Sequence, residues 1–174
     1  MPELIEPTVD LRDSWLESAA EWGDAHQDGA GVWEADDLST AEGFAAWTQR
    51  LRDASHDVCT ADRVPSTYWW IVDGTTYLGA ITLRHPLNAK LLEGGGHIGY
   101  GVRPAARGRG LATWALGQVL DRARERGLDR VLITCDDDNL ASARTIERNG
   151  GVLEDVRDTW VSPRTRRYWI TLRD

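Results

Sequence analysis

Residues 102–113 read Val102-Arg103-Pro104-Ala105-Ala106-Arg107-Gly108-Arg109-Gly110-Leu111-Ala112-Thr113. This segment follows a predicted strand at 97–102 and begins a predicted helix at about 108–126. The first turn of a helix leaves backbone N–H groups without partners at the positive end of its dipole. Gly108 and Gly110 let an anion approach this backbone, while Arg107 and Arg109 add charge that matches phosphate oxygens. The pattern predicts a diphosphate cradle; the alternative is an ordinary basic loop before a helix.

A dinucleotide-binding loop is a different kind of diphosphate site, and its spacing fits less well. Such a loop follows its strand almost at once, carries a third glycine and has an acid about 20 residues later. Here residues 103–106 separate the strand from the loop, and Thr113 stands where the third glycine would be. A dinucleotide-binding oxidoreductase is therefore an alternative that the spacing disfavours.

The chain divides at Pro65 into a helical part and a part rich in strands. The expected helices before it run from about 11 to 24, capped by Asp10, and from about 39 to 51, opened by Ser39 and Glu42 as a capping box. After Pro65, aromatic and β-branched runs predict strands, which cover residues 68–72, 77–83, 97–102, 130–135, 152–161 and 167–172. A loop is expected at 86–96, and a last helix at about 139–149 with Asn139 as its cap. This order predicts an α+β layered fold: a mostly antiparallel sheet with one parallel crossover and helices on both faces.

Composition narrows the class of protein. The chain has 174 residues and a net charge of −8, which suits a single domain over residues 1–174. Residues 1–64 carry net −11 and residues 65–174 carry net +3, which argues against nucleic acid and suits a cationic substrate beside an anionic cofactor. The alternative interpretation is that these acidic residues only keep the outer faces of the helices in contact with water. No apolar run is long enough for a membrane span and no signal peptide precedes the domain, so we expect a cytoplasmic protein.

Two further groups of residues are possible metal or thiol sites. Asp136, Asp137 and Asp138 are consecutive at a strand end, where their side chains alternate in direction and do not converge on a metal, so no metal is expected. Cys135 continues an apolar strand and is expected in the core, and Cys59 lies in a polar loop without a histidine partner.

The hexapeptide Arg107–Ala112 resembles the acetyl-CoA signature of the GNAT superfamily of N-acetyltransferases. The order and spacing of the strand at 97–102, the long helix, the strand at 130–135 and the helix beginning at Asn139 are similar to that fold. Further segments look like one uncharacterised bacterial subgroup of predicted acetyltransferases, namely Arg84–Asn88, Gly94–Tyr100, Ile133–Asp136 and Ile146–Gly151. The likeness covers roughly residues 68–155, and the helical first third only by element order.

This resemblance implies how acetyl-CoA would bind. The pantetheine arm would lie where two central strands splay apart, pairing with the edge of the strand near Tyr100, Gly101 and Val102, one of whose N–H groups would polarise the thioester carbonyl. Asn139 and Ser142 would contact the arm from the other side; for Asn139, a plain helix cap is the alternative. The diphosphate would lie on the cradle, to which we assign Arg107, Gly108, Arg109, Gly110, Leu111, Ala112 and Thr113.

The resemblance also implies a reaction. An acceptor ammonium must lose a proton, and the candidate bases by position are His97, Glu93 and Tyr100. Many family members place a tyrosine seven residues after the helix-start asparagine to protonate the CoA thiolate, and here that position is Ile146. Ser142, a water or Tyr100 would supply the proton instead, or the thiolate would leave unaided.

On the acceptor side, His85 is expected to reach the same pocket, with Arg84 and Asn88 beside it as substrate contacts. Tryptophans of the acidic helical third, Trp15, Trp22, Trp33 and Trp47, would line an acceptor wall or pack in the core. A terminal hairpin with Trp160, Tyr168 and Trp169 is a candidate homodimer surface.

These observations predict an acetyl-CoA-dependent N-acetyltransferase that acts by direct transfer in a ternary complex. The expected acceptor is a small-molecule primary amine, with a peptide or protein amine, N-terminal or lysine, as the second choice. The alternative from another class is a degenerate domain that binds acyl-CoA as a sensor or structural partner, which the absence of a tyrosine at Ile146 motivates.

Overall fold

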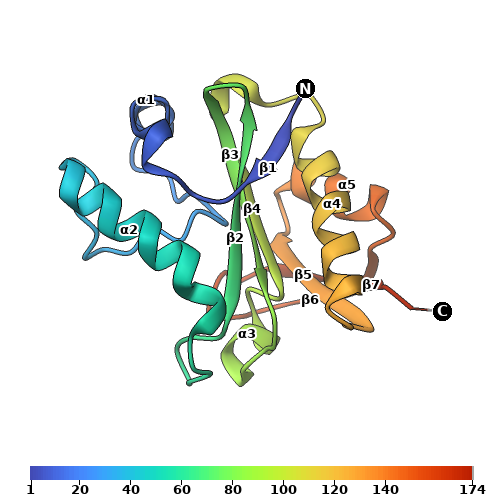
Figure 1. The fold of residues 1–174 in the computed structure, drawn as a ribbon. Coiled ribbons are helices and arrows are strands. Elements are labelled where there is room, and N and C mark those ends of the chain that lie inside the picture. The colour runs from blue at the N-terminus through green and yellow to red at the C-terminus, as the bar shows by residue number, and fades with distance from the viewer. Residues whose placement is uncertain (174) are drawn as a thin grey trace.

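The computed structural model describes residues 1–173 of the chain. In chain order its elements are β1 (Glu3–Ile5), the 3₁₀ turn η1 (Val9–Leu11), α1 (Arg12–Trp22), α2 (Ala41–Asp53), η2 (Ala54–His56), β2 (Ser66–Asp73), β3 (Thr76–Arg84), α3 (Ala89–Glu93), β4 (Ile98–Val102), η3 (Pro104–Ala106), α4 (Leu111–Glu125), β5 (Arg130–Asp136), α5 (Leu140–Arg148), β6 (Val152–Arg157) and β7 (Thr165–Thr171). The expected α+β fold is confirmed: antiparallel strands form its centre, with α1 and α2 on one side and α4 and α5 on the other (Figure 1).

The strands form two antiparallel sheets instead of one continuous sheet. The first has the order β1-β2-β3-β4 and the second the order β5-β7-β6. The expected crossover leads from β4 through α4 to β5, but no ladder joins these two strands in residues 1–173. Instead the His97 N–H donates to Leu132 O at 2.7 Å, and the Leu132 N–H donates to His97 Nδ1 at 2.9 Å. The two sheets are therefore tied at the start of β4 and separate beyond it.

Each face of the first sheet carries its own hydrophobic core. Trp15, Phe44, Trp47, Trp70 and Tyr77 meet as a cluster of rings between the sheet and the helices α1 and α2. On the other face, α4 and α5 cover a larger aliphatic core that includes the fully buried Ile81, Leu116, Val119, Val131, Ile133 and Ile146. Strands between two such layers present apolar side chains on both faces, and β3 is accordingly almost continuously buried.

Several expected details of the helices are wrong, each for a local reason. Thr8, not Asp10, accepts the capping hydrogen bond, because a 3₁₀ turn precedes α1. Thr40, not Ser39, caps α2, since the Ser39 hydroxyl is bonded to Asp37 at 2.6 Å. Asn139 does cap α5 through a bond from the Ser142 N–H at 3.1 Å, as expected.

Three segments differ from the expected strands and loops. The short strand β1 pairs antiparallel with β2, in the register Glu3↔Val72. The expected loop at 86–96 contains α3, which Asn88 caps. The strand expected at 152–161 ends at Arg157, and the hairpin that follows is closed by Thr159 and Ser162.

The hairpin also bears on the candidate dimer surface. Tyr168 is fully buried, so it cannot contribute to a surface between molecules. Trp169 is partly covered by the guanidinium of Arg130, 4.0 Å from its ring centroid, whereas Trp160 is 52% exposed. Of the three residues expected on this surface, Trp160 is the most exposed, although its Nε1 donates to Lys90 O at 2.7 Å, and a homodimer stays a prediction.

Candidate functional site

A cleft of about 1200 Å³ opens where β4 and β5 separate. Most of its walls come from the β4 edge, the end of β5, the beginnings of α4 and α5, and the loop at 26–33 between α1 and α2. Residues of β2, β3 and the β6–β7 hairpin complete the lining. Segments distant in sequence therefore converge on the gap between the two sheets.

The edge of β4 that faces the gap presents free backbone groups. The Arg84 N–H donates to His97 O and the Arg103 N–H to Leu78 O, both at 2.7 Å, across the β3–β4 pair. Because hydrogen-bonding residues alternate along an antiparallel strand, Gly99 and Gly101 direct their backbone groups to β3. Tyr100 and Val102 then point theirs toward β5, with which no ladder forms in the described chain, although Val102 O accepts from Arg107 Nε at 3.1 Å. This edge can accept an extended, amide-bearing ligand as an additional strand would pair.

The beginning of α4 is open toward the same cleft. Gly110 is the cap residue and supplies no side-chain cap, so N–H groups of the first turn have no partner from a capping side chain. Gly108 and Gly110 have φ values of +77° and +76°, and space is open where a Cβ would stand on either. Gly108, Gly110, Leu111, Ala112 and Thr113 line the cleft. The backbone there has the open helix start that the sequence predicted, and its binding of an anion stays a prediction.

The two arginines of this loop lie differently. Arg107 lines the cleft; its Nε donates to Val102 O at 3.1 Å and its guanidinium stacks on the Trp22 ring at 4.7 Å. Arg109 is exposed and lies outside the cleft lining. Arg144 and Arg148 of α5 line the cleft as well, and the sequence analysis did not identify them. Their spacing of four residues places both on one helix face, which was the signal available.

Tyr100 and Ser142 form a polar pair in the cleft. The Tyr100 hydroxyl lies 2.7 Å from Ser142 Oγ, so a phenol from β4 meets a hydroxyl from α5. Burial raises the pKa of Tyr100 well above its usual value, although the bond to Ser142 acts in the opposite direction. Tyr100 is therefore a neutral proton donor at physiological pH. Ile146, where the resemblance implied a tyrosine, is fully buried one turn further along α5.

Cys135 lies beside this pair, half-buried: it packs against the larger core, as expected, and also lines the cleft. Burial raises its pKa to about 11. A thiol with this pKa is not a nucleophilic thiolate at neutral pH.

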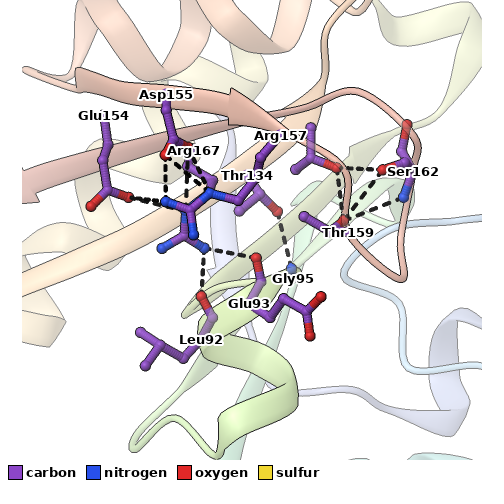
Figure 2. A network of polar contacts seen from close by, with 11 residues as sticks. Leu92, Glu93, Gly95, Thr134, Glu154, Asp155, Arg157, Thr159, Ser162 and Arg167 are labelled. Carbon is purple, nitrogen blue, oxygen red and sulfur yellow. Dashed lines mark hydrogen bonds and ion pairs between the residues drawn. The ribbon is translucent and has the colours of Figure 1, made fainter.

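The two other candidate bases lie outside the cleft. His97 is 8% exposed, and its Nδ1 accepts from the Leu132 N–H at 2.9 Å. Burial, together with the charges of Arg84 and Arg130, lowers its pKa to about 4. Glu93 ends α3, is exposed and does not line the cleft; its carbonyl accepts from Arg167 at 2.7 Å (Figure 2). The expectation that either reaches the reacting atoms is not supported by these positions.

The expected substrate contacts separate in a similar way. His85 lies outside the cleft, with Nε2 2.7 Å from Thr67 Oγ1, and burial lowers its pKa to about 4. Asn88 caps α3 and donates to the carbonyls of Thr60 and Ala61, so its amide is fully used in the fold. Of the three predicted substrate contacts, only Arg84 lines the cleft.

The loop at 26–33 roofs the cleft and carries polar groups that the sequence analysis missed. Its Gly29 has φ +77°, and a Cβ there would stand 2.4 Å from Gly99 O. Gly29 O also accepts from Thr82 Oγ1 at 2.6 Å. The glycines of β4 thus let this loop lie directly on the strand. The sequence does not reveal this contact, because neither segment indicates which other segment it packs against.

Asp28 is the acidic group of this roof. Its Oδ1 lies 3.2 Å from His26 Nε2, and both side chains are exposed within the cleft. Loss of surrounding water raises the pKa of Asp28, while His26 and Arg84 act to lower it and Asp136 adds to the rise. The cleft therefore holds a carboxyl poised to bind a cation or exchange a proton.

The tryptophans of the first third divide between core and cleft. Trp15 and Trp47 are almost fully buried and pack in the core. Trp22 packs over Gly101 next to the cleft, and Trp33, 40% exposed, lines it. Trp114 is partly buried against the larger core.

No group of three or more His, Cys, Asp or Glu in residues 1–173 is arranged to hold a metal ion. Asp137 is bonded to Arg164 and Arg166 instead, and these bonds lower its pKa. Within the same part of the chain, no helix combines the length and apolarity needed to cross a bilayer.

Comparison with known proteins gives one family and several structural relatives. A family model described as an acetyltransferase (GNAT) domain matches residues 6–152. No curated protein matches the sequence.

Solved structures of similar fold cover nearly the whole chain. One is the microcin C7 self-immunity acetyltransferase MccE in complex with acetyl-CoA and AMP, with 16% identity, 98% of this chain and 92% of that chain covered, and a TM-score of 0.70. Another is a Salmonella typhimurium acetyltransferase that modifies the N-terminal serine of ribosomal protein L7/L12, with 16% identity, 98% and 94% coverage, and a TM-score of 0.66. A third is yncA of Salmonella typhimurium with acetyl-CoA, with 14% identity, 100% and 94% coverage, and a TM-score of 0.62.

Proposed function

Because the chain belongs to the GNAT acetyltransferase family, we propose that it transfers the acetyl group of acetyl-CoA to a small-molecule primary amine by direct transfer in a ternary complex. The observation that carries this proposal is the cleft between β4 and β5, which joins an open helix start to an unpaired strand edge. We assign residues 65–174 to the binding of acetyl-CoA and residues 1–64 to the acceptor wall, within one domain over 1–174.

Acetyl-CoA fits the groups that line the cleft. The N–H groups at the start of α4 would hold the diphosphate, with Arg107 beside it and Arg144 and Arg148 adding charge from α5. The pantetheine amides would pair with the free edge of β4 at Tyr100 and Val102. When bound, acetyl-CoA supplies an activated thioester, and a backbone N–H of this edge would stabilise the oxygen of the tetrahedral intermediate.

The acceptor would enter from the opposite face of β4. Gly99 and Gly101 face the loop at 26–33, whereas Tyr100 faces α5, so the two substrates would meet across the strand edge. Asp28 would hold the ammonium and accept its first proton, directly or through water. The cleft reaches about 1200 Å³ and is roofed by this loop, which supports a small acceptor over a folded protein surface.

Tyr100 would complete the proton balance. The amine nitrogen attacks the carbonyl carbon, the C–S bond breaks, and the phenol gives its proton to the leaving sulfur. The amide nitrogen then gives up its second proton, which returns to Tyr100 through Ser142 at 2.7 Å. Because Tyr100 stays neutral, its proton is available, and a phenol from β4 takes the place of the tyrosine that α5 lacks at Ile146.

Calorimetric titration with acetyl-CoA, using NAD and NADP as controls, tests the binding step. We expect acetyl-CoA alone to bind, with a Kd on the order of micromolar. Arg107→Ala should weaken this binding, while Arg52→Ala, an exposed change on α2, should not. Absence of acetyl-CoA binding would overturn the proposal.

Release of free thiol with a panel of amines tests the transfer step. Small primary amines should release CoA at rates well above hydrolysis, and faster than peptides with free N-terminal or lysine amines. Tight acetyl-CoA binding without transfer to any amine would instead favour the alternative of a non-catalytic acyl-CoA binder.

A further inference from the structure

Arg84 lines the cleft next to Gly99 and Gly29, as a partly buried cation that forms no ion pair within residues 1–173. It ends β3, and its Nη1 donates to Gly95 O at 3.2 Å and to Gly96 O at 3.0 Å. No ion pair to Arg84 forms within residues 1–173, and its Nε and Nη2 donate to no atom there. A guanidinium that is partly removed from water and has free donors favours binding of an anion.

The unused donors of Arg84 face open space. The residue lines the main cleft and also a smaller cavity of about 170 Å³ that adjoins it. Trp33, Tyr68 and Trp160 line both, so the two cavities meet at Arg84. Nε and Nη2 form the edge of the guanidinium fork that matches two oxygens of a carboxylate or phosphate.

Other charges of the smaller cavity leave it positive. Arg50 is paired with Asp36 at 2.6 Å, and Arg63 with Asp57 at 3.8 Å. Arg50 and Arg63 stack on Trp33, and Lys90 lies 4.7 Å from the Trp160 ring centroid. Two cations of the lining, Lys90 and Arg84, form no ion pair in the described chain, whereas only one acid of the lining, Asp62, is unpaired there. The unpaired charges of the smaller cavity are therefore mostly positive.

Negative charge lines the same cleft close to Arg84. Asp28 stands in the roof beside the β4 edge, where the reacting amine would lie, and Asp136 lines the cleft nearby. A cation-binding group and an anion-binding group that line one cleft fit a ligand that carries both charges.

We propose that the acceptor is an amine that also bears an anionic group, an amino acid or a phosphorylated amine, with its anion bound by Arg84 and its ammonium directed toward Asp28. This inference rests on the proposed function and specifies the class of its acceptor. Arg84 is thereby a specificity-determining residue, in addition to its bonds to the glycine loop.

The test compares matched acceptors in the thiol-release assay. Phenylalanine is set against phenylalaninamide and phenethylamine, and O-phosphoethanolamine against ethanolamine. We expect kcat/KM to be higher for the anionic member of at least one set by about 30-fold, the effect of a desolvated charge pair. A preference only in the first set identifies a carboxylate, and one only in the second a phosphate.

Arg84→Gln should reduce this preference to about twofold or less while the KM for acetyl-CoA stays unchanged. Because Arg84 also holds Gly95 and Gly96, Arg167→Gln is the matched control. Arg167 is 4% exposed and donates to Glu93 O at 2.7 Å, holding the same segment from the other side, yet it lines neither cavity (Figure 2). It should keep the anion preference even where it lowers stability.

An inhibition experiment on the unaltered protein tests the proposal even if the Arg84 variant does not fold. 3-Phenylpropionate, which has the carboxylate but no amine, should inhibit competitively against the acceptor, and 3-phenylpropanol should not. Equal kcat/KM for charged and neutral amines, or loss of preference in both variants, would overturn the assignment of Arg84 and leave the acetyltransferase proposal intact. Transfer to no amine at all would reject both.

Discussion

Acidification should destabilise this protein through His97, a residue whose position suggested a catalytic base. In the folded chain His97 is 8% exposed, its Nδ1 accepts from the Leu132 N–H at 2.9 Å, and its pKa is lowered to about 4. In the unfolded chain the pKa returns to about 6.5. Between these values the unfolded state binds more protons, so stability is fully present above about pH 6.5 and is lost as the pH falls through about 4.

The size of the effect follows from this difference in pKa. The contribution of His97 to the free energy of unfolding should fall by about 2 kcal/mol between about pH 7.5 and about pH 5, and by about 3 kcal/mol once the pH nears 4. Physically, protonation of Nδ1 removes the acceptor for Leu132 and places a charge near Arg84 and Arg130. His85, whose pKa is also about 4, adds to the loss in the same range.

Urea unfolding at a series of pH values measures this loss. His97→Asn supplies an amide oxygen in place of Nδ1 but does not titrate, so its stability should depend less steeply on pH than that of the unaltered protein. His56→Asn, at an exposed position in η2, is the control and should keep the full dependence. Identical pH dependence in His97→Asn and the unaltered protein would refute the assignment of this role to His97. The pH profile of acetyl transfer should be unchanged in His97→Asn, because the residue lies outside the cleft.

Three other changes test the cleft. Tyr100→Phe should lower kcat by about 10- to 100-fold with little change in acetyl-CoA affinity; an unchanged kcat would mean that the thiolate leaves without this proton. Gly29→Ala places a Cβ 2.4 Å from Gly99 O at φ +77°, so it should reduce the free energy of unfolding by about 2 kcal/mol or more and raise the acceptor KM. Gly74→Ala, at φ +59° with open space around it, is the control for the effect of φ alone, and equal loss in both would argue against contact between roof and strand. Arg109→Ala should weaken acetyl-CoA binding at low ionic strength and have little effect at high salt, because this exposed charge is screened; calorimetry at two salt concentrations decides.

The end of the cleft formed by the start of α4 was predictable because its conformation depends on local sequence. A glycine-bearing basic loop between a strand and a helix needs no distant partner to present unpaired N–H groups, so Arg107, Gly108 and Gly110 lie where the sequence placed them. The Asn139 cap is equally local. The position of Tyr100 on a strand edge also followed from sequence, but its bond to Ser142 joins residues 42 apart and came only from the fold.

The acceptor end was predicted less well because it is assembled from distant segments. Four of the predicted site residues are close in sequence to the segments that form the cleft: His97, Glu93, His85 and Asn88. In the fold, a side chain or a carbonyl of each is hydrogen-bonded to another part of the chain. Conversely, Asp28 sits in a polar loop with no motif of its own. Sequence position gives the strand but not which way a side chain turns or what it meets.

Sequence by itself determined the layered α+β fold, the family and the glycine-bearing start of α4, because apolar periodicity, helix ends and glycine-rich turns act over a few residues. Tertiary structure decided that the strands form two sheets, that the cleft opens where these sheets separate, and that Asp28 and Arg84 line this same cleft. The physical reason is that burial and pairing depend on groups brought together from far along the chain. The pKa of His97 and the unpaired charge of Arg84 are set by such neighbours and by the loss of water around them.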